Sequence, residues 1–220
     1  MPERDPTPAP PVGRGPKVQA AVRAATLAEL LEKGYAELTV DAVAQRAGVH
    51  KTTVYRRWTD RETLVVDALA EHFAAEIPVE DTGAVETDLH ALARALVASM
   101  TGPVGAAVQA AMYSDAGRLP EIAEARRRLF ADRFRRAEPL VRRAVDRGEL
   151  PAGTDPVEVF EALAALIHFR LLVTAEPVDD ALADRTARIV LAAARAGELV
   201  SPTARARATG DRPPSTDDQR

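Results

Sequence analysis

Apolar residues recur three and four positions apart along most of this chain, the spacing that gathers them on one face of an α-helix. A clear example is the series Val85, Leu89, Leu92 and Leu96. The pattern predicts nine helices, at about residues 17–33, 40–47, 50–58, 60–75, 85–100, 104–114, 121–147, 156–173 and 180–196. No segment is a convincing strand, and the low aromatic content of 4% favours closely packed helices over a β-sandwich. We therefore expect an all-α fold.

Residues 39–62 depart from this simple pattern, because a short apolar helix is followed by a glycine turn and a second helix rich in cations and hydroxyls. Thr39 is placed to cap the first helix, and Gly48 suits a left-handed turn after it. The second helix is too polar to be buried. This arrangement is typical of a helix-turn-helix, whose second helix enters the DNA major groove.

Positive charge is concentrated in the same segment. Between Arg46 and Arg61 there are five cations and a single acid, Asp60, although the whole chain has a formal net charge of -4. Most charge runs are merely solvated faces. Here the charge, the turn and the helix spacing agree, so we interpret the surplus as a surface that neutralises DNA phosphates.

The segment resembles the TetR/AcrR family of transcriptional regulators over about 50 residues. The matching positions are Gly34-Tyr35, Thr39-Val40, Ala44-Gln45-Arg46-Ala47-Gly48-Val49, Lys51-Thr52-Thr53-Val54-Tyr55, Trp58 and Arg61. Two positions depart from the family pattern: His50 stands where a serine cap is usual, and Trp58 stands where phenylalanine is usual.

The resemblance implies roles for individual side chains. Phosphate contacts are implied for Thr39, Thr53, Tyr55 and Arg61. Base-edge contacts are implied for Lys51, Thr52 and Arg56, with His50 as a further candidate. For Trp58 we favour a packing role beneath the helix.

The resemblance also implies a two-domain organisation: an N-terminal three-helix domain that carries the helix-turn-helix and a C-terminal helical domain for ligand binding and dimerisation. Prolines in residues 1–15 and a polar tail mark the two ends as disordered, and a break near Pro78 and residues 81–83 divides the rest. The expected parts are a disordered arm at 1–15, the DNA-binding domain at 16–77, the C-terminal domain at 83–198 and a disordered tail at 199–220. Residues 170–177 are similar to an AcrR-like subgroup.

The last two predicted helices are apolar around much of their circumference, so they need cover on more than one side. Burial within the domain would provide it, and so would a four-helix bundle with a second subunit. The family resemblance favours the homodimer. The candidate interface residues are Phe160, Ala164, Ile167, Leu171, Leu182, Ile189, Val190 and Ala193.

A small-molecule pocket in the C-terminal domain is a further expectation from the resemblance. The candidate lining residues are Leu96, Met100, Val104, Val108, Met112, Phe130, Phe134 and His168. For any one of them ordinary core packing is the simpler interpretation. Their Met and Phe content suits an apolar ligand. The arginines at 126–128, 135–136 and 142–143 are interpreted as a solvated stripe.

The sequence thus predicts a dimeric repressor that a small, largely apolar ligand releases from an inverted-repeat operator. A DNA-binding regulator without a small-molecule ligand remains an alternative, as does an enzyme with an appended helix-turn-helix. The four histidines are scattered, and no HExxH pair, phosphate loop or GxSxG elbow is present, so we expect no catalytic residues, metal or cofactor. The absence of cysteine, of a signal peptide and of long apolar runs is consistent with a cytoplasmic protein that does not enter the membrane.

Overall fold

The structure is a computed structural model that describes residues 14–113, 120–201 and 204. Its described part contains α-helices and no named strand, as the sequence pattern predicts. The helices are α1 (Arg14–Glu37), α2 (Val40–Arg46), α3 (Lys51–Tyr55), α4 (Arg61–Glu76), α5 (Val85–Thr101), α6 (Pro103–Tyr113), α7 (Pro120–Asp146), α8 (Pro156–Phe169) and α9 (Asp180–Arg195), and a π-helical turn, η2 (Arg170–Thr174), extends α8.

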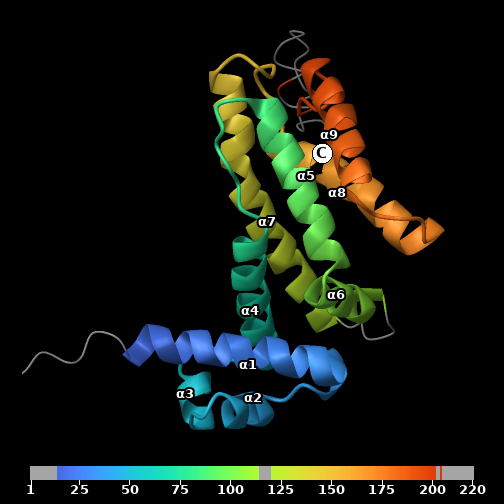
Figure 1. Ribbon diagram of the computed structural model, residues 1–220. Helices are drawn as coiled ribbons and strands as arrows, with labels where there is room; N and C mark the ends of the chain where they lie inside the picture. The colour runs from blue at the N-terminus through green and yellow to red at the C-terminus, as the bar shows by residue number, and fades with distance from the viewer. Residues whose placement is uncertain (1–13, 114–119, 202–203, 205–220) are drawn as a thin grey trace, which may run out of the picture.

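Helices α1 to α3 form a compact head at one end of the molecule (Figure 1), with α1 lying across α2 and α3. The Thr39 hydroxyl caps α2 by accepting a hydrogen bond from the Ala42 amide at 3.2 Å, as the sequence predicts. The Asp60 carboxylate caps α4 by accepting a hydrogen bond from the Thr63 amide at 2.6 Å. Helix α4 then rises from the head and packs on α7, so it connects the head to the C-terminal helices.

The C-terminal helices pack around α5 and α7, with α9 along α5 and α8 against both α7 and α9. Helix α6 bends away from α5 by 69° and contacts α1. A Cβ at Gly105 would lie 2.1 Å from the Ser99 carbonyl oxygen, so this close crossing of α5 and α6 requires glycine. No single helix in the described ranges is long and apolar enough to span a membrane.

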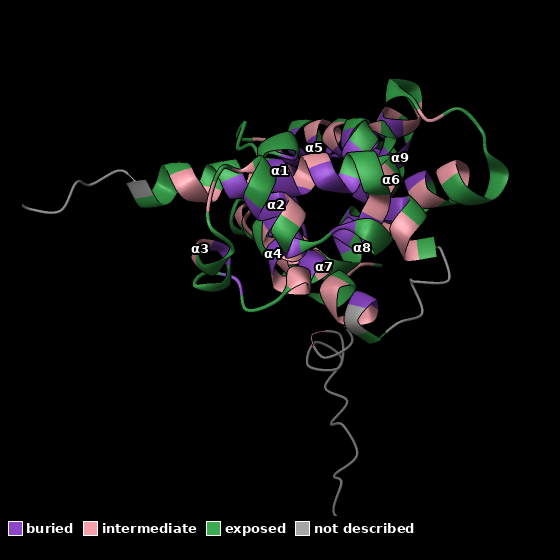
Figure 2. Cartoon of the chain, turned by 90° about the horizontal axis from the view of Figure 1, so that it is seen from below, coloured by how far each residue is buried: buried purple, intermediate pink, exposed green. Residues whose placement is uncertain are grey.

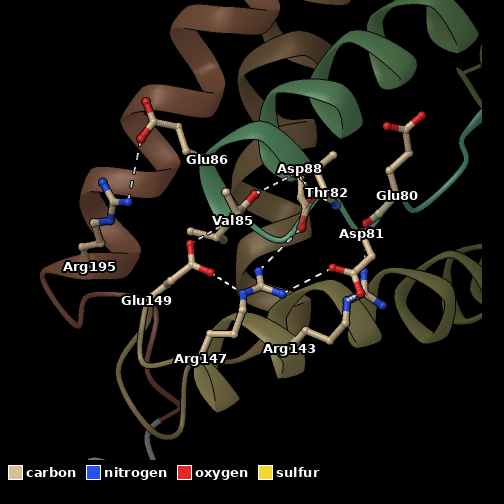
Figure 3. Close-up of polar contacts among 11 residues, drawn as sticks. Glu80, Asp81, Thr82, Val85, Glu86, Asp88, Arg143, Arg147, Glu149 and Arg195 are labelled. Carbon is tan, nitrogen blue, oxygen red and sulfur yellow. Dashed lines mark hydrogen bonds and ion pairs between the residues drawn. The ribbon is translucent and has the colours of Figure 1, made fainter.

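A network of ion pairs ties the connection between α4 and α5 to the end of α7 (Figure 3). Arg147 lies 3.4 Å from Asp81 and 3.7 Å from the buried Asp88, and it also pairs with Glu149. Asp88 accepts from the Thr82 amide at 2.8 Å and from its hydroxyl at 2.7 Å. The segment near residue 81, where the sequence predicts a break, is therefore held to the end of α7 by ion pairs and hydrogen bonds.

Three boundaries differ from the sequence-based expectation. Helix α1 begins at Arg14, so the N-terminal arm would end before residue 14, and the rest of that arm lies outside the described residues. Gly34 interrupts α1 with φ 75°, directly after residue 33, where the sequence predicts the end of this helix, but a further turn of helix follows it. The predicted disordered tail was wrong at its start, because Val200 forms a β-bridge with Thr154 and the Asp155 amide donates to the Leu199 carbonyl at 2.8 Å.

Candidate DNA-binding surface and ligand cavity

Helix α3 lies at the surface of the head, with much of its length exposed (Figure 2), and its exposed side chains are polar. Its predicted contact residues divide by exposure: Thr53 is half-buried, and the exposed ones are His50, Lys51, Thr52, Tyr55 and Arg56. Only Val54 points into the core, with 1% of its surface exposed. His50 makes no side-chain cap, which agrees with its departure from the family's serine. These side chains converge on one face that a phosphate backbone and base edges could meet.

The position of this face is set from beneath by Trp58, which is 3% exposed. Its indole Nε1 donates to Asp67 of α4 at 2.9 Å, and Arg23 of α1 donates to the same carboxylate at 2.8 Å. Burial raises the pKa of Asp67, but the hydrogen bonds from Arg23 and Trp58 outweigh it and leave that pKa below its usual value. The packing role predicted for Trp58 is confirmed, and Asp67 joins α1, α3 and α4 at one point.

The cations of this segment are not equally available. Arg46 donates to Glu29 at 2.7 Å and also pairs with Glu32. Lys51 lies 3.3 Å from Asp41 in an exposed pair that solvent screens. Within the described part of the chain, no ion pair holds Arg56 or Arg57. The positive charge free to meet DNA is therefore smaller than the sequence count suggests.

Arg61 occupies a more enclosed place than its predicted phosphate contact implies. Its guanidinium lies 4.5 Å from the centre of the Tyr35 ring and 3.1 Å from Glu62. Tyr35 donates to the same carboxylate at 3.0 Å, and burial followed by this hydrogen bond raises the pKa of Tyr35 to about 12. A phosphate contact by Arg61 would compete with these interactions. Thr39 is less constrained, because its capping hydroxyl still has its own proton to donate.

An open cavity of about 650 Å³ lies between α7 and α8 and is lined mainly by aromatic and small residues. Phe130, Phe134 and His168 line it, as the sequence predicts. The Phe134 and Phe160 rings meet edge-on with their centres 5.5 Å apart, so Phe160, which the sequence predicts as an interface residue, lines this cavity.

The other predicted pocket residues lie elsewhere. Met100, Val108 and Met112 line a second cavity of about 20 Å³ that also touches Phe130 and His168. Leu96 and Val104 are buried core residues of α5 and α6 and line none of the cavities described here. Six of the eight predicted pocket residues therefore line one or both of these two cavities, and their role in binding a ligand stays a prediction.

The predicted dimer-interface residues also divide by burial. Four of them are buried within the single chain and expose little surface to a partner: Phe160, Ala164, Ile167 and Val190. Ile189 is exposed, and three are half-buried: Leu171, Leu182 and Ala193. The helical periodicity could not predict this difference, because α8 and α9 are apolar both on the faces that meet each other and on the faces that point away from the rest of the chain.

An apolar outer face nevertheless remains on α8, η2 and α9. Leu166, Phe169 and Ile189 are 39%, 56% and 46% exposed, and they line a common cavity of about 250 Å³. We call these three residues the outer face.

Comparison with known proteins agrees with this geometry. Residues 22–68 match the family model described as "Bacterial regulatory proteins, tetR family", and residues 79–190 match "Tetracyclin repressor-like, C-terminal domain". The chain belongs to the TetR family.

Two relatives of this TetR-family regulator extend the similarity over most of the chain. HTH-type transcriptional regulator AqdR from Rhodococcus erythropolis is 31% identical over 178 residues, 81% of this chain and 86% of the relative. DNA-binding transcriptional repressor TetR from Mycobacteroides abscessus is 33% identical over 186 residues, 82% and 95% of the two chains. The crystal structure of TetR family transcription regulator SCO0332 superposes with a TM-score of 0.65 and 32% identity, covering 84% of this chain and all of the other.

Sequence reasoning missed one residue of this TetR-family protein that the structure singles out, Arg133. It sits on the buried stripe of α7, four residues after Leu129 and four before Ala137, whereas the arginines read as a solvated stripe are mostly exposed. Its place in the helical register was the available signal. Among the described residues, no group of three His, Asp or Glu side chains is placed to hold a metal ion.

Proposed function

We propose that this TetR-family regulator is a homodimeric repressor that acts in the cytoplasm and that a small, largely apolar effector releases from its operator. The observation that carries the proposal is the pairing of an exposed polar face on α3 with an apolar cavity between α7 and α8 in the same chain. The relative from M. abscessus is named as a DNA-binding transcriptional repressor, which supports repression rather than activation.

On DNA, α3 would enter the major groove. Lys51, Thr52 and Arg56 would then reach base edges, with His50 beside them, while Thr39, Thr53 and Tyr55 hold phosphates. Arg61 would add a phosphate contact only if it left the Tyr35 ring. This arrangement makes two kinds of substitution distinguishable: loss of a phosphate contact weakens all sequences alike, and loss of a base contact alters the preference among them.

Selection from a pool of short random duplexes, repeated at several salt concentrations, tests the DNA-binding part. We expect an enriched inverted repeat, bound by a dimer, with an affinity that falls steeply as salt rises. Tyr55→Ala should weaken matched and mismatched operators equally, whereas Thr52→Ala should change their ratio. Lack of enrichment by the ligand-free protein would contradict the proposal.

The dimer would form through the outer face of α8 and α9. Light scattering at micromolar concentration should give the mass of two chains for the unaltered protein. Ile189→Glu and Phe169→Glu should give the mass of one, because each puts a charge into a buried apolar contact. The matched control is Leu31→Glu, which changes a residue of α1 with a similar exposed fraction of 44%. A monomeric unaltered protein, or a dimer that tolerates both changes, would contradict the proposed interface.

A further inference from the structure

A small cavity enclosed by α4 to α8 contains two buried polar atoms with unused hydrogen-bonding capacity. It measures about 20 Å³, and Arg133 and Ser99 are among its lining residues. Within the described residues, neither Arg133 Nε nor Ser99 Oγ has a hydrogen-bond partner. Buried polar groups are normally satisfied, so two that line one cavity require an explanation.

Arg133 is held by aromatic rings instead of by a carboxylate. Its guanidinium lies 3.9 Å from the centre of the Phe73 ring and 5.6 Å from that of Phe130. The neighbouring acid, Asp132, pairs with Arg135 and Arg136 on the outside of α7. Burial lowers the pKa of Arg133 to about 10, which leaves the guanidinium charged at neutral pH.

The other polar groups around this cavity are already engaged. Gln109 Nε2 donates to the Met100 carbonyl at 2.9 Å. His168 Nδ1 lies 2.9 Å from the Ala164 carbonyl, which can only accept, so Nδ1 carries the proton and Nε2 is the bare nitrogen. Burial lowers the pKa of His168 and keeps the ring neutral. The free donors and the one positive charge therefore belong to Arg133 and Ser99.

The small cavity adjoins the large one. Phe130 and His168 line both, so the unpaired guanidinium lies close behind the wall of the open apolar cavity of about 650 Å³. Since these two side chains are shared by both linings, we expect a rotation of either one to connect the two cavities. A molecule in the large cavity could then place one end against Arg133.

We propose that this site binds an amphiphilic organic anion, with an aryl or alkyl body in the large cavity and a single carboxylate on Arg133 and Ser99. The two donors match the two oxygens of a carboxylate, and the guanidinium supplies the charge that such a group needs in an apolar surrounding. That this anion is also the effector rests on the proposed function, whereas the binding of the anion does not.

Calorimetric titration of the purified full-length protein tests the site without DNA. The probes are 4-phenylbutyrate and octanoate, each compared with its uncharged alcohol, 4-phenylbutanol or octanol. We expect saturable binding of at least one acid and binding of its alcohol at least about tenfold weaker, the loss expected for a charge-assisted hydrogen bond. Equal affinity of acid and alcohol, or no saturable binding of either acid up to about 10 mM, would overturn the proposal.

Three variants assign the effect to the buried guanidinium. Arg133→Met should abolish the preference for acid over alcohol, and Arg133→Lys should restore part of it because it keeps the charge. Arg142→Met is the matched control, since Arg142 is an exposed arginine of the same helix that lines neither cavity. Acid binding that survives Arg133→Met, or that is lost equally in Arg142→Met, would overturn the assignment.

Ser99→Ala keeps the test decisive if Arg133 variants fold poorly. It should weaken acid binding several-fold and leave alcohol binding unchanged. The operator recovered by selection then separates the two proposals. Acid binding that does not weaken operator binding would overturn the release mechanism and leave the anion site standing.

Discussion

Positive charge has opposite surroundings on the exposed polar face of α3 and in the small cavity that Arg133 of α7 lines. At the end of α3, Arg56 is exposed, whereas Val54 and Trp58 are buried and hold the helix in position. On α7, Arg133 is half-buried, and its guanidinium rests on the Phe73 ring. An exposed side chain that contacts an external partner can be removed with little loss of stability. A desolvated charge that is paired only when an internal ligand binds lowers the stability of the free protein. The free energy of unfolding should therefore respond differently in the two regions.

The largest effect is expected where the head depends on its buried support. Trp58→Ala should lower the free energy of unfolding by about 3–5 kcal/mol, because it opens a cavity beneath α3 and removes the hydrogen bond to Asp67. Urea denaturation followed by circular dichroism measures this loss. Trp58→Phe, the residue usual in the family, should recover more than half of it. An unchanged midpoint for Trp58→Ala would contradict the supporting role.

The opposite sign is expected at the cavity. Arg133→Met should raise the free energy of unfolding by about 1–3 kcal/mol, since it replaces a largely desolvated charge, whose buried Nε has no hydrogen-bond partner among the described residues, with an apolar side chain of similar length. The same urea series measures the gain, with Arg126→Met as the exposed control. A destabilised Arg133→Met would mean that the contact with Phe73 outweighs the desolvation of the charge.

A smaller effect, and one that depends on pH, is expected at Asp67. Asp67→Asn should lower the free energy of unfolding by about 1 kcal/mol at pH 7, because it weakens hydrogen bonds that solvent partly screens. The pKa of Asp67 is lower in the folded chain, so its contribution is complete above the ordinary aspartate pKa and is lost as the pH falls through the folded value. The gap between the two proteins should begin to narrow as the pH falls below about 4 and should be smaller at pH 3 than at pH 7. A gap of undiminished size at pH 3 would contradict this.

The smallest change in stability is expected on the recognition face. Arg56→Ala should alter the free energy of unfolding by less than about 0.5 kcal/mol, because the side chain is exposed and makes no ion pair among the described residues. Its affinity for the selected operator should nevertheless fall about tenfold, which electrophoretic mobility shift at fixed salt would measure. Arg46→Ala offers the contrast. It should destabilise α2 against α1 through the lost pairs with Glu29 and Glu32.

The helix-turn-helix could be predicted closely because its signals are local. Thr39 caps α2 through the backbone three residues away, and Gly48 adopts φ 66° within the turn it was expected to form. The electrostatics of the head could not be predicted in the same way. Arg46 is neutralised by acids of α1, which lie 14 and 17 positions earlier in the chain.

The C-terminal region was harder for the same physical reason. Helical periodicity identified α8 and α9 as apolar, but Ile167 and Ile189 satisfy it equally well although one is buried and the other exposed. Which apolar face meets another helix of the same chain depends on the crossing of helices far apart in sequence. Arg133 was overlooked because its neighbours at 126–128 and 135–136 made it look like one more solvated arginine.

The junction at Trp58 has one more consequence. The chain contains one tryptophan, and its indole donates to the carboxylate that joins α1, α3 and α4. Indole emission shifts with the polarity of its surroundings, so the tryptophan fluorescence of the unlabelled protein, excited at a wavelength that the three tyrosines do not absorb, is a signal from this junction alone. A rotation of the head relative to α4 can therefore be followed as a shift in the wavelength of tryptophan emission, without attaching any dye.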